Sequence, residues 1–473
     1  MGNLFHVFKD AKGFYLYDQG INSVKVIDDK TYAMLLEIEN SKKSIDYTSP
    51  LIKSLQNEGF LIPNQITDVK HYAIDYIEEL LQRKLTTLVL QITQKCNLRC
   101  EYCSFTHNDG NYRLHSNKTM DLKIAKKSVD FLKKNSVDNT HVSISFYGGE
   151  PFLEFEKIRE IVEYANLVFV GKEIIYNVTT NATVLTDKSL RFIEDNNFNL
   201  SISIDGNKYV NDKKRRFHIG KNSVYDKVKA AIEKIAVEYP TLFSKLSINM
   251  VMDPSEDFKN YYEIINDIPE LSRIRITTNI CGDEHSATKN VYTTNFIAGY
   301  QYCEFISYLR YFDRYTVSSK DNIFDNDVAR EVYSITNSMT SHNVSQVSYP
   351  GGPCIPGYRK LFITTNGDMF PCEKLNEKSR IFKIGTVDNG FDYNSIRRLL
   401  QLAKITEEQC KKCWAFTLCI SCLLNCDGKH RLSQSKRLSK CKEVKSLAEY
   451  KLRKYVMYNN IISETSRLSF MEV

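Results

Sequence analysis

The chain has 473 residues, enough for about two to four domains, and its 42% hydrophobic and 26% charged residues exclude disordered, collagen-like and low-complexity proteins. Its formal net charge of +7 is spread along the whole length without long basic runs, which argues against a nucleic-acid partner. No stretch approaches the roughly 18 apolar residues of a membrane span, and the N-terminus lacks the apolar core of a signal peptide, so we expect no membrane association.

Residues 1–80 are predicted to form a small winged-helix-like domain. Three short alternating segments predict strands, and two segments with helical periodicity follow them, at 6–10, 13–18, 23–28, 29–39 and 49–60. The hydrophilic segment 75–84 is expected to link this domain to the next one.

Residues 86–285 alternate between strand-like and helix-like segments. The strand candidates lie at 86–93, 141–146, 173–180, 200–205, 245–251 and 272–278. Six β/α units in a row predict an α/β fold with a parallel sheet, either open or closed as a partial (β/α)6 TIM-like barrel, in which chemistry collects at the carboxyl ends of the strands. A helical connection at 286–345, a Cys-rich domain at 350–445 and a C-terminal helix or tail at 446–473 complete the predicted order.

The thirteen cysteines are the most informative feature of the composition. Their odd number, their tight local spacing and the lack of an export signal argue against a disulfide framework, so we expect a cytoplasmic protein whose thiolates hold metal. Only Cys281 and Cys303 stand apart from the others, and we interpret them as small buried hydrophobic residues.

Cys96, Cys100 and Cys103 lie on one short segment directly after the first strand of the α/β region. Three thiolates spaced in this way can hold three irons of a 4Fe-4S cluster, which leaves the fourth iron open for a substrate or cofactor. A zinc site completed by a distant fourth ligand is the alternative, although zinc loops usually carry Cys-x2-Cys pairs.

CNLRCEYC at 96–103 and FYGGEP at 146–151 resemble the two strand-end signatures of the radical SAM superfamily. The resemblance implies that the cysteines bind the cluster that cleaves S-adenosylmethionine (SAM), and that Tyr102 lies against the adenine. Gly148 and Gly149 would allow close approach of the backbone to the ligand, and Glu150 would accept from the ammonium group of SAM.

Polar residues follow the next two predicted strands. The same resemblance implies that Asn181, Ser203 and Asp205 bind the ribose and carboxylate of SAM, and that Arg215 binds its carboxylate. Each could instead be a turn-forming residue. Asn211 stands where the family often has a histidine. This resemblance covers residues 86–280.

Eight cysteines between 354 and 441 resemble a SPASM domain, which holds two auxiliary 4Fe-4S clusters, so the resemblance implies three clusters in all. Cys410, Cys413, Cys419 and Cys441 would bind the outer cluster. Cys354 and Cys372 would begin the inner one. Either Cys422 and Cys426 both complete it, or one of them does and the other is free or leaves a site for a substrate thiol. A pair of zinc knuckles is the alternative for this region alone.

Glu373 follows Cys372, where formylglycine-forming sulfatase maturases of this family carry an aspartate as base. A carboxylate here could take a proton from the substrate during the reaction. The alternative is a solvated charge beside a cluster, and the longer side chain is a mild argument against a sulfatase maturase.

The combined resemblance predicts a radical SAM peptide maturase that makes a thioether in a ribosomally made precursor peptide, as sactipeptide and ranthipeptide maturases do. The N-terminal domain resembles elements that bind the leader of such a peptide by strand addition, although pure scaffolding is an alternative. A flavodoxin or ferredoxin would supply electrons. The competing hypotheses are another peptide reaction, such as a carbon-carbon crosslink or formylglycine formation, and a non-enzymatic iron-sulfur or zinc scaffold.

Overall fold

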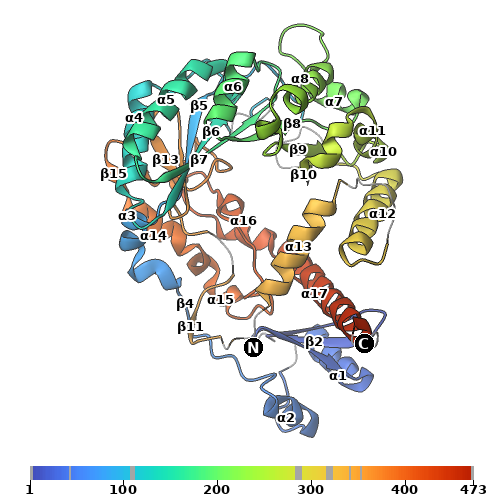
Figure 1. The fold of residues 1–473 in the computed structure, drawn as a ribbon. Coiled ribbons are helices and arrows are strands. Elements are labelled where there is room, and N and C mark those ends of the chain that lie inside the picture. Colours follow the sequence, from blue (N-terminus) through green and yellow to red (C-terminus); the bar gives the residue numbers. More distant parts are fainter. Residues whose placement is uncertain are drawn as a thin grey trace. The chain divides into compact units, whose positions relative to one another are not determined.

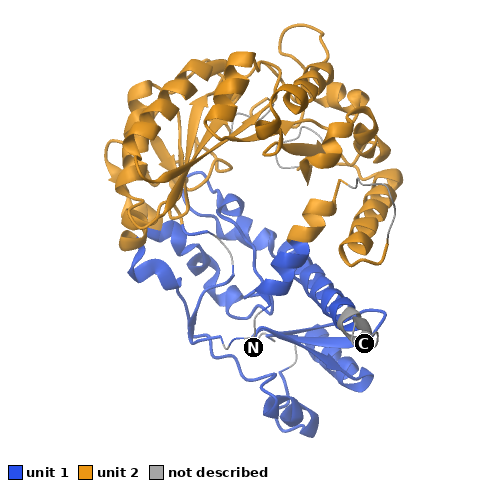
Figure 2. Cartoon of the chain, in the orientation of Figure 1, with its two compact units in different colours: residues 1–77, 331–355, 397–473 blue, residues 78–330, 356–396 orange. Residues whose placement is uncertain are grey.

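The computed structural model describes residues 4–41, 44–106, 112–282, 290–315, 323–339, 342, 344–351 and 354–469. The chain divides into two compact units, which are coloured separately in Figure 2. The first unit consists of residues 1–77, 331–355 and 397–473, and the second of residues 78–330 and 356–396.

The second unit is built on a ten-stranded sheet, whose parallel part includes the six strands of the predicted β/α region. These strands are β5 (Thr87–Thr93), β6 (His141–Gly148), β7 (Glu173–Thr180), β8 (Asn199–Ser203), β9 (Ser247–Met252) and β10 (Arg275–Ile280). They are adjacent in chain order, as expected for consecutive β/α units. The predicted α/β fold with a parallel sheet is therefore confirmed, and all six predicted strands are present.

Helices connect the parallel strands, and Figure 1 shows α4, α5 and α6 along one face of the sheet. The longer connections are α4 (Leu122–Lys134), α5 (Phe155–Val168), α6 (Asp187–Asp195), α7 (Lys208–Lys214) and α8 (Val224–Glu238), and the short ones are α9 (Pro240–Phe243), α10 (Lys259–Tyr262) and α11 (Ile264–Asp267). Side chains at the N-termini of four of them accept from backbone amides that lack a partner in the helix. These capping residues are Asp121, Thr186, Asn207 and Ser223.

Four further strands extend the sheet beyond β5, and the sequence analysis did not predict them. They are β12 (Lys360–Ile363), β13 (Asp368–Phe370), β14 (Gly385–Thr386) and β15 (Gly390–Phe391). β12 lies parallel to β5, and the other three follow in antiparallel pairs. Part of the predicted Cys-rich domain therefore belongs to the same sheet as β5, the strand that precedes the cysteine segment.

Helices occupy two segments outside the β/α units. Residues 75–84, expected to be a link, contain helix α3 (Ile77–Arg83). The predicted helical connection at 286–345 contains α12 (Thr294–Tyr311) and α13 (Asp325–Ser338). Among the described helices, none is long and apolar enough to cross a membrane.

The first unit begins with a three-stranded antiparallel sheet and two helices, as predicted. The sheet consists of β1 (Phe5–Lys9), β2 (Phe14–Asp18) and β3 (Ser23–Ile27), followed by α1 (Asp29–Ser41) and α2 (Pro50–Asn57). One side of this module is a hydrophobic core that contains Phe5, Leu16, Leu35, Ile52 and Leu55.

Residues from the end of the chain pack against the other side of the same module. Phe8, Tyr15 and Tyr17 share a core with Leu452 and Val456 of the C-terminal helix α17 (Cys441–Ser469). The remaining elements of this part of the chain are β4 (Asp68–Val69), β11 (Val347–Ser348), α14 (Tyr393–Leu400), α15 (Glu407–Cys410) and α16 (Gln434–Ser439). Segments far apart in sequence thus form one hydrophobic core around the N-terminal sheet.

Candidate functional site

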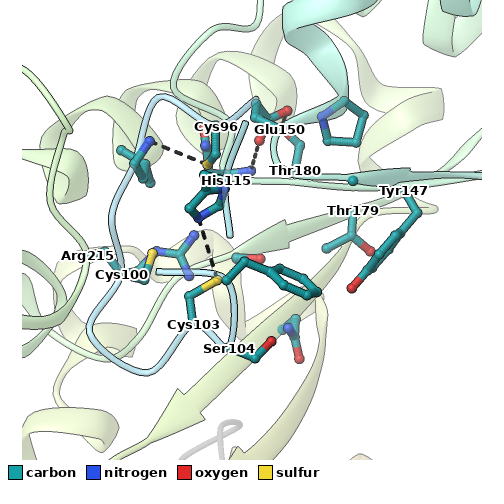
Figure 3. A pocket seen from close by; sticks show the side chains of 18 of the residues that line it. Cys96, Cys100, Cys103, Ser104, His115, Tyr147, Glu150, Thr179, Thr180 and Arg215 are labelled. Atoms are coloured by element: carbon teal, nitrogen blue, oxygen red, sulfur yellow. Dashed lines mark hydrogen bonds between the residues drawn. The ribbon is translucent and has the colours of Figure 1, made fainter. Parts of the chain in front are cut away.

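A cavity of about 350 Å³ opens at the carboxyl ends of the parallel strands in the second unit. We call it the strand-end cavity. Its lining contains ten of the eleven residues predicted for the first cluster and SAM: Cys96, Cys100, Tyr102, Cys103, Gly148, Gly149, Glu150, Asn181, Ser203 and Arg215. Figure 3 shows the three cysteine side chains in this cavity together with Glu150 and Arg215. The eleventh residue, Asp205, is not among the lining residues.

Backbone hydrogen bonds hold the cysteine segment in place. The amide of Cys103 donates to the carbonyl of Cys100 at 3.2 Å, and the amide of Glu101 donates to the carbonyl of Lys214 at 2.9 Å. Burial raises the pKa of Cys96 to about 12 and that of Cys100 to about 11. The thiols are therefore protonated on their own, and a metal centre is required to hold them as thiolates.

Gly148, the last residue of β6, and Gly149, the next residue, bring the end of that strand against the cysteine segment. A Cβ on Gly148 would lie 2.0 Å from the carbonyl oxygen of Thr93, and a Cβ on Gly149 would lie 2.0 Å from that of Lys95. The sequence analysis expected the glycines to admit the ligand. In the structure, both glycines approach the backbone just before Cys96. They therefore position the cysteine segment.

Replacing Gly149 by alanine is expected to destabilise the protein by about 1–3 kcal/mol and to lower SAM cleavage, because the backbone next to Cys96 must move. Thermal unfolding and a SAM cleavage assay would measure both effects. Gly282→Ala is the matched control, because, apart from its two chain neighbours, no atom of the described residues lies within 4 Å of a Cβ at that position. Equal stability and activity of the two variants would contradict this role of Gly149.

Glu150 is 1% exposed and accepts three hydrogen bonds in the wall of the cavity. The donors are the amide of Phe152 at 3.1 Å, the hydroxyl of Thr180 at 2.7 Å and the amide of Asn181 at 2.7 Å. Burial raises the pKa of Glu150, and these hydrogen bonds oppose that effect. Because a carboxylate has about four acceptor positions, one remains for an ammonium group of a ligand.

Arg215 joins Tyr102 and Asp205 in a buried network beside the cysteines. Its Nη1 donates to the Tyr102 hydroxyl at 2.6 Å, and that hydroxyl donates to Asp205. The guanidinium lies 3.6 Å from the Asp205 carboxylate. The Nε of Arg215 is buried and has no hydrogen-bond partner among the described residues. This free donor on the cavity wall fits the carboxylate of an amino-acid ligand.

His115 and Thr180 also line the cavity, and the sequence analysis missed both. The Nε2 of His115 lies 3.9 Å from Cys103 Sγ, as the dashed line in Figure 3 shows. Burial lowers the pKa of His115 to about 4, so the imidazole is neutral near pH 7. His115 carried no sequence signal because it lies outside both signatures, whereas Thr180 directly precedes Asn181.

A second cavity, of about 230 Å³, lies in the first unit. We call it the four-cysteine cavity, because Cys410, Cys413, Cys419 and Cys441 all line it. These are the four residues predicted for the outer auxiliary cluster. Burial raises the pKa of Cys413 to about 11 and also raises those of Cys419 and Cys441. The donor set and the size of the cavity fit a metal cluster at this position.

The cysteines predicted for the inner cluster have different surroundings. Cys354 and Cys422 are exposed, and Cys426 is buried, all three in the first unit. Cys372 belongs to the second unit. The ligand set of an inner cluster therefore stays a prediction.

Glu373 forms an ion pair with Lys360, whose Nζ lies 3.1 Å from one carboxylate oxygen. The Cys372 thiol donates to the other oxygen at 3.5 Å. Burial raises the pKa of Glu373, but its own backbone amide and Lys360 outweigh burial and shift that pKa downward. The side chain is thus a paired carboxylate at neutral pH, able to accept a proton.

Zinc and an iron-sulfur cluster place different demands on the positions of the thiols. Within the described part of the chain, no three His, Cys, Asp or Glu side chains converge closely enough to hold one metal ion. A zinc ion binds its thiolates at about 2.3 Å from a single point. The thiolates of a 4Fe-4S cluster bind separate irons and need no common point. None of the thirteen cysteines forms a disulfide.

Comparison with known proteins agrees with this geometry. The sequence profile of the radical SAM superfamily matches residues 90–268. An uncharacterized protein of Methanocaldococcus jannaschii is 34% identical over 174 residues, which are 37% of this chain and 57% of that protein. The cysteine-type anaerobic sulfatase-maturating enzyme of Clostridium perfringens is 24% identical over 388 residues, covering 80% of this chain and 99% of that enzyme.

The fold is similar to a solved structure, that of native anSMEcpe with bound AdoMet and Cp18Cys peptide. The two superpose with a TM-score of 0.54 at 20% sequence identity, covering 80% of this chain and 99% of the other.

Proposed function

Because residues 90–268 are a radical SAM domain, we propose that this chain is an enzyme that uses SAM to modify a ribosomally made precursor peptide. The proposed product is a thioether between a cysteine sulfur and a carbon of another residue. The observation that carries the proposal is that two predicted cysteine sets line two separate cavities, one at the strand ends and one in the first unit. The relatives that mature proteins and bind a peptide support a peptide substrate.

The strand-end cavity offers partners for the first cluster and for the ammonium and carboxylate groups of SAM. Cys96, Cys100 and Cys103 would hold the first 4Fe-4S cluster. Glu150 has an acceptor position for the ammonium of SAM, and the Nε of Arg215 is a donor for its carboxylate. When bound together, the cluster and SAM supply a 5′-deoxyadenosyl radical that can remove a hydrogen atom from carbon.

Thioether formation removes one hydrogen from a carbon and one from a sulfur. The hydrogen on carbon leaves as an atom, whereas the hydrogen on sulfur leaves as a proton and an electron. The Glu373 carboxylate is the group proposed to accept the proton. The electron needs an acceptor, and the cysteines of the four-cysteine cavity are proposed to hold one as an auxiliary cluster.

Replacing Glu373 by glutamine is expected to lower the rate of product formation about a hundredfold, because the amide cannot accept the thiol proton. SAM cleavage is expected to continue, since Glu373 does not line the strand-end cavity. Mass spectrometry of the peptide and chromatography of 5′-deoxyadenosine would measure the two reactions separately. Glu373→Asp, which keeps a carboxylate, is the control and should retain most of the product. Full product formation by the glutamine variant would contradict the assignment of the base.

The N-terminal three-stranded sheet is proposed to bind the leader of the precursor by strand addition. Its strand order leaves β3 at one edge, and Val26 on that strand is 70% exposed. An edge strand offers unpaired backbone groups to an extended peptide. This assignment would give the N-terminal module a role in substrate selection.

Removal of the leader is expected to weaken peptide binding to the whole enzyme at least about tenfold, which corresponds to about 1.4 kcal/mol. Fluorescence anisotropy with labelled full-length and leaderless peptides would measure the two dissociation constants. A scrambled leader of the same composition controls for charge. Equal affinity for all three peptides would show that the N-terminal module does not recognise the leader.

The product itself distinguishes the proposed reaction from its alternatives. The reconstituted enzyme would be incubated anaerobically with SAM, a reductant and a Cys-containing precursor peptide. A thioether lowers the peptide mass by two hydrogens and makes one cysteine resistant to alkylation. A carbon-carbon crosslink gives the same mass but leaves every cysteine reactive, and formylglycine formation from cysteine removes the sulfur. Either of these two products would overturn the thioether proposal.

We further propose a cytoplasmic location and a flavodoxin or ferredoxin as reductant. The thirteen cysteines, none of which forms a disulfide, support a reducing compartment.

A further inference from the structure

Arg437 on helix α16 is a buried arginine whose side-chain hydrogen bonds go to two neutral hydroxyl groups. It is 3% exposed. Its Nε donates to the Thr406 hydroxyl at 3.0 Å, and its Nη1 donates to the Ser421 hydroxyl at 3.1 Å. Within the described residues, no carboxylate lies within ion-pair distance of this guanidinium. Burying an unpaired charge is costly, so a nearby anion is expected.

The groups around Arg437 that can become anionic are cysteines. Arg437 lines the four-cysteine cavity together with Cys410 and Cys419. The guanidinium also interacts electrostatically with the buried thiol of Cys426.

Other cations line this cavity, but they differ from Arg437 in exposure. Lys412 is exposed and Lys445 is half-buried. A charge in contact with water is strongly screened, whereas a buried charge acts at close to full strength on its neighbours. Among the lining cations, Arg437 is therefore the one that can act most strongly on a metal centre in the cavity.

We infer that Arg437 is the counter-charge of the metal cluster in the four-cysteine cavity and raises its reduction potential. This inference rests on the proposed auxiliary cluster. Each electron added to a cluster makes it more negative, so a fixed positive charge beside it stabilises the reduced form more than the oxidised form. Arginine suits this role because it stays protonated even when buried, whereas a buried lysine can lose its proton. Arg437 is thus a positioning residue for the electron acceptor and does not contact the substrate.

The test is a redox titration followed by electron paramagnetic resonance. It would use the Cys96→Ala, Cys100→Ala, Cys103→Ala background, in which the first cluster cannot form. The signal lost on further replacement of Cys413 by alanine identifies the outer cluster. Arg437→Gln removes the charge and keeps hydrogen-bond donors, and Arg437→Lys keeps a charge. Lys436→Gln is the control, an exposed cation next to Arg437 on the same helix.

Arg437→Gln is expected to shift the outer cluster to a lower potential, with at least a tenfold fall in the reduced-to-oxidised ratio at a fixed potential, or about 59 mV. Arg437→Lys should recover part of this shift, and Lys436→Gln should cause none. Loss of outer-cluster iron in the glutamine variant but not in the lysine variant would also support the inference.

An unchanged potential in Arg437→Gln with full iron content would overturn the inference and leave the proposed function intact. Equal loss of iron in the glutamine and lysine variants would likewise overturn it, since the role of Arg437 would then be one of packing. If the parent protein binds no iron in the four-cysteine cavity, the proposed auxiliary cluster fails, and the inference fails with it. Iron analysis of the parent therefore separates the two failures.

Discussion

Replacing Cys96, Cys100 and Cys103 together by alanine is expected to abolish SAM cleavage and to remove about four irons per chain from the anaerobically reconstituted protein. The three side chains line the strand-end cavity, and burial keeps the thiols of Cys96 and Cys100 protonated unless a metal binds them. Without them, the chain has no thiolates beside Glu150 and Arg215. Iron and sulfide analysis together with a 5′-deoxyadenosine assay would measure the loss.

Cys281→Ala is the control for this experiment, because Cys281 lies outside both cysteine cavities. It is expected to keep the iron content and activity of the parent. The parent itself should bind about twelve irons if all three predicted clusters form. Tightly bound zinc and no SAM cleavage by the parent would contradict the enzyme proposal and favour a metal-stabilised scaffold.

Replacing Arg215 by methionine is expected to lower the free energy of unfolding by about 3–5 kcal/mol, because it leaves the Asp205 carboxylate buried without its cation. The side chains of Arg215 and Asp205 are 7% and 1% exposed. SAM binding should weaken as well, since the donor proposed for the SAM carboxylate is lost. Chemical denaturation would measure stability, and equilibrium dialysis with labelled SAM would measure affinity.

Arg216→Met is a matched control one residue away. Its guanidinium lies 3.4 Å from Glu101, but the side chain is 60% exposed, and surface pairs of this kind contribute at most about 1 kcal/mol. The adjacent arginines should therefore differ by several kcal/mol. A similarly small loss of stability in both variants would show that the buried ion pair of Arg215 and Asp205 does not stabilise the protein.

The sequence predicted those parts of the site that depend on the order of strands along the chain. Cys96, Glu150, Asn181 and Ser203 lie at or just after the ends of successive parallel strands, and the ends of such strands meet at one edge of the sheet. Alternating apolar patterns and turn residues placed these strands within a few residues of their observed ends. Identifying the strand ends was therefore enough to bring most lining residues together.

The sequence could not predict the contacts that depend on long-range packing. β12 joins the sheet beside β5 although about 270 residues separate them in the chain. Asp205 was expected to face SAM, but it is not among the residues that line the cavity, and it accepts a hydrogen bond from Tyr102. Arg437 lies in no sequence motif. Its proposed role depends on its burial beside cysteines that precede and follow it in the chain.

The central claim is that SAM-derived chemistry at the strand-end cavity removes a hydrogen atom from a carbon of a precursor peptide. The most direct test is to supply a peptide deuterated at the carbon that forms the crosslink, and to measure deuterium in the 5′-deoxyadenosine by mass spectrometry. The account predicts one deuterium in each 5′-deoxyadenosine formed together with a crosslinked peptide. Crosslinked peptide accompanied by 5′-deoxyadenosine without deuterium, or SAM cleavage that leaves every tested peptide unchanged, would contradict it.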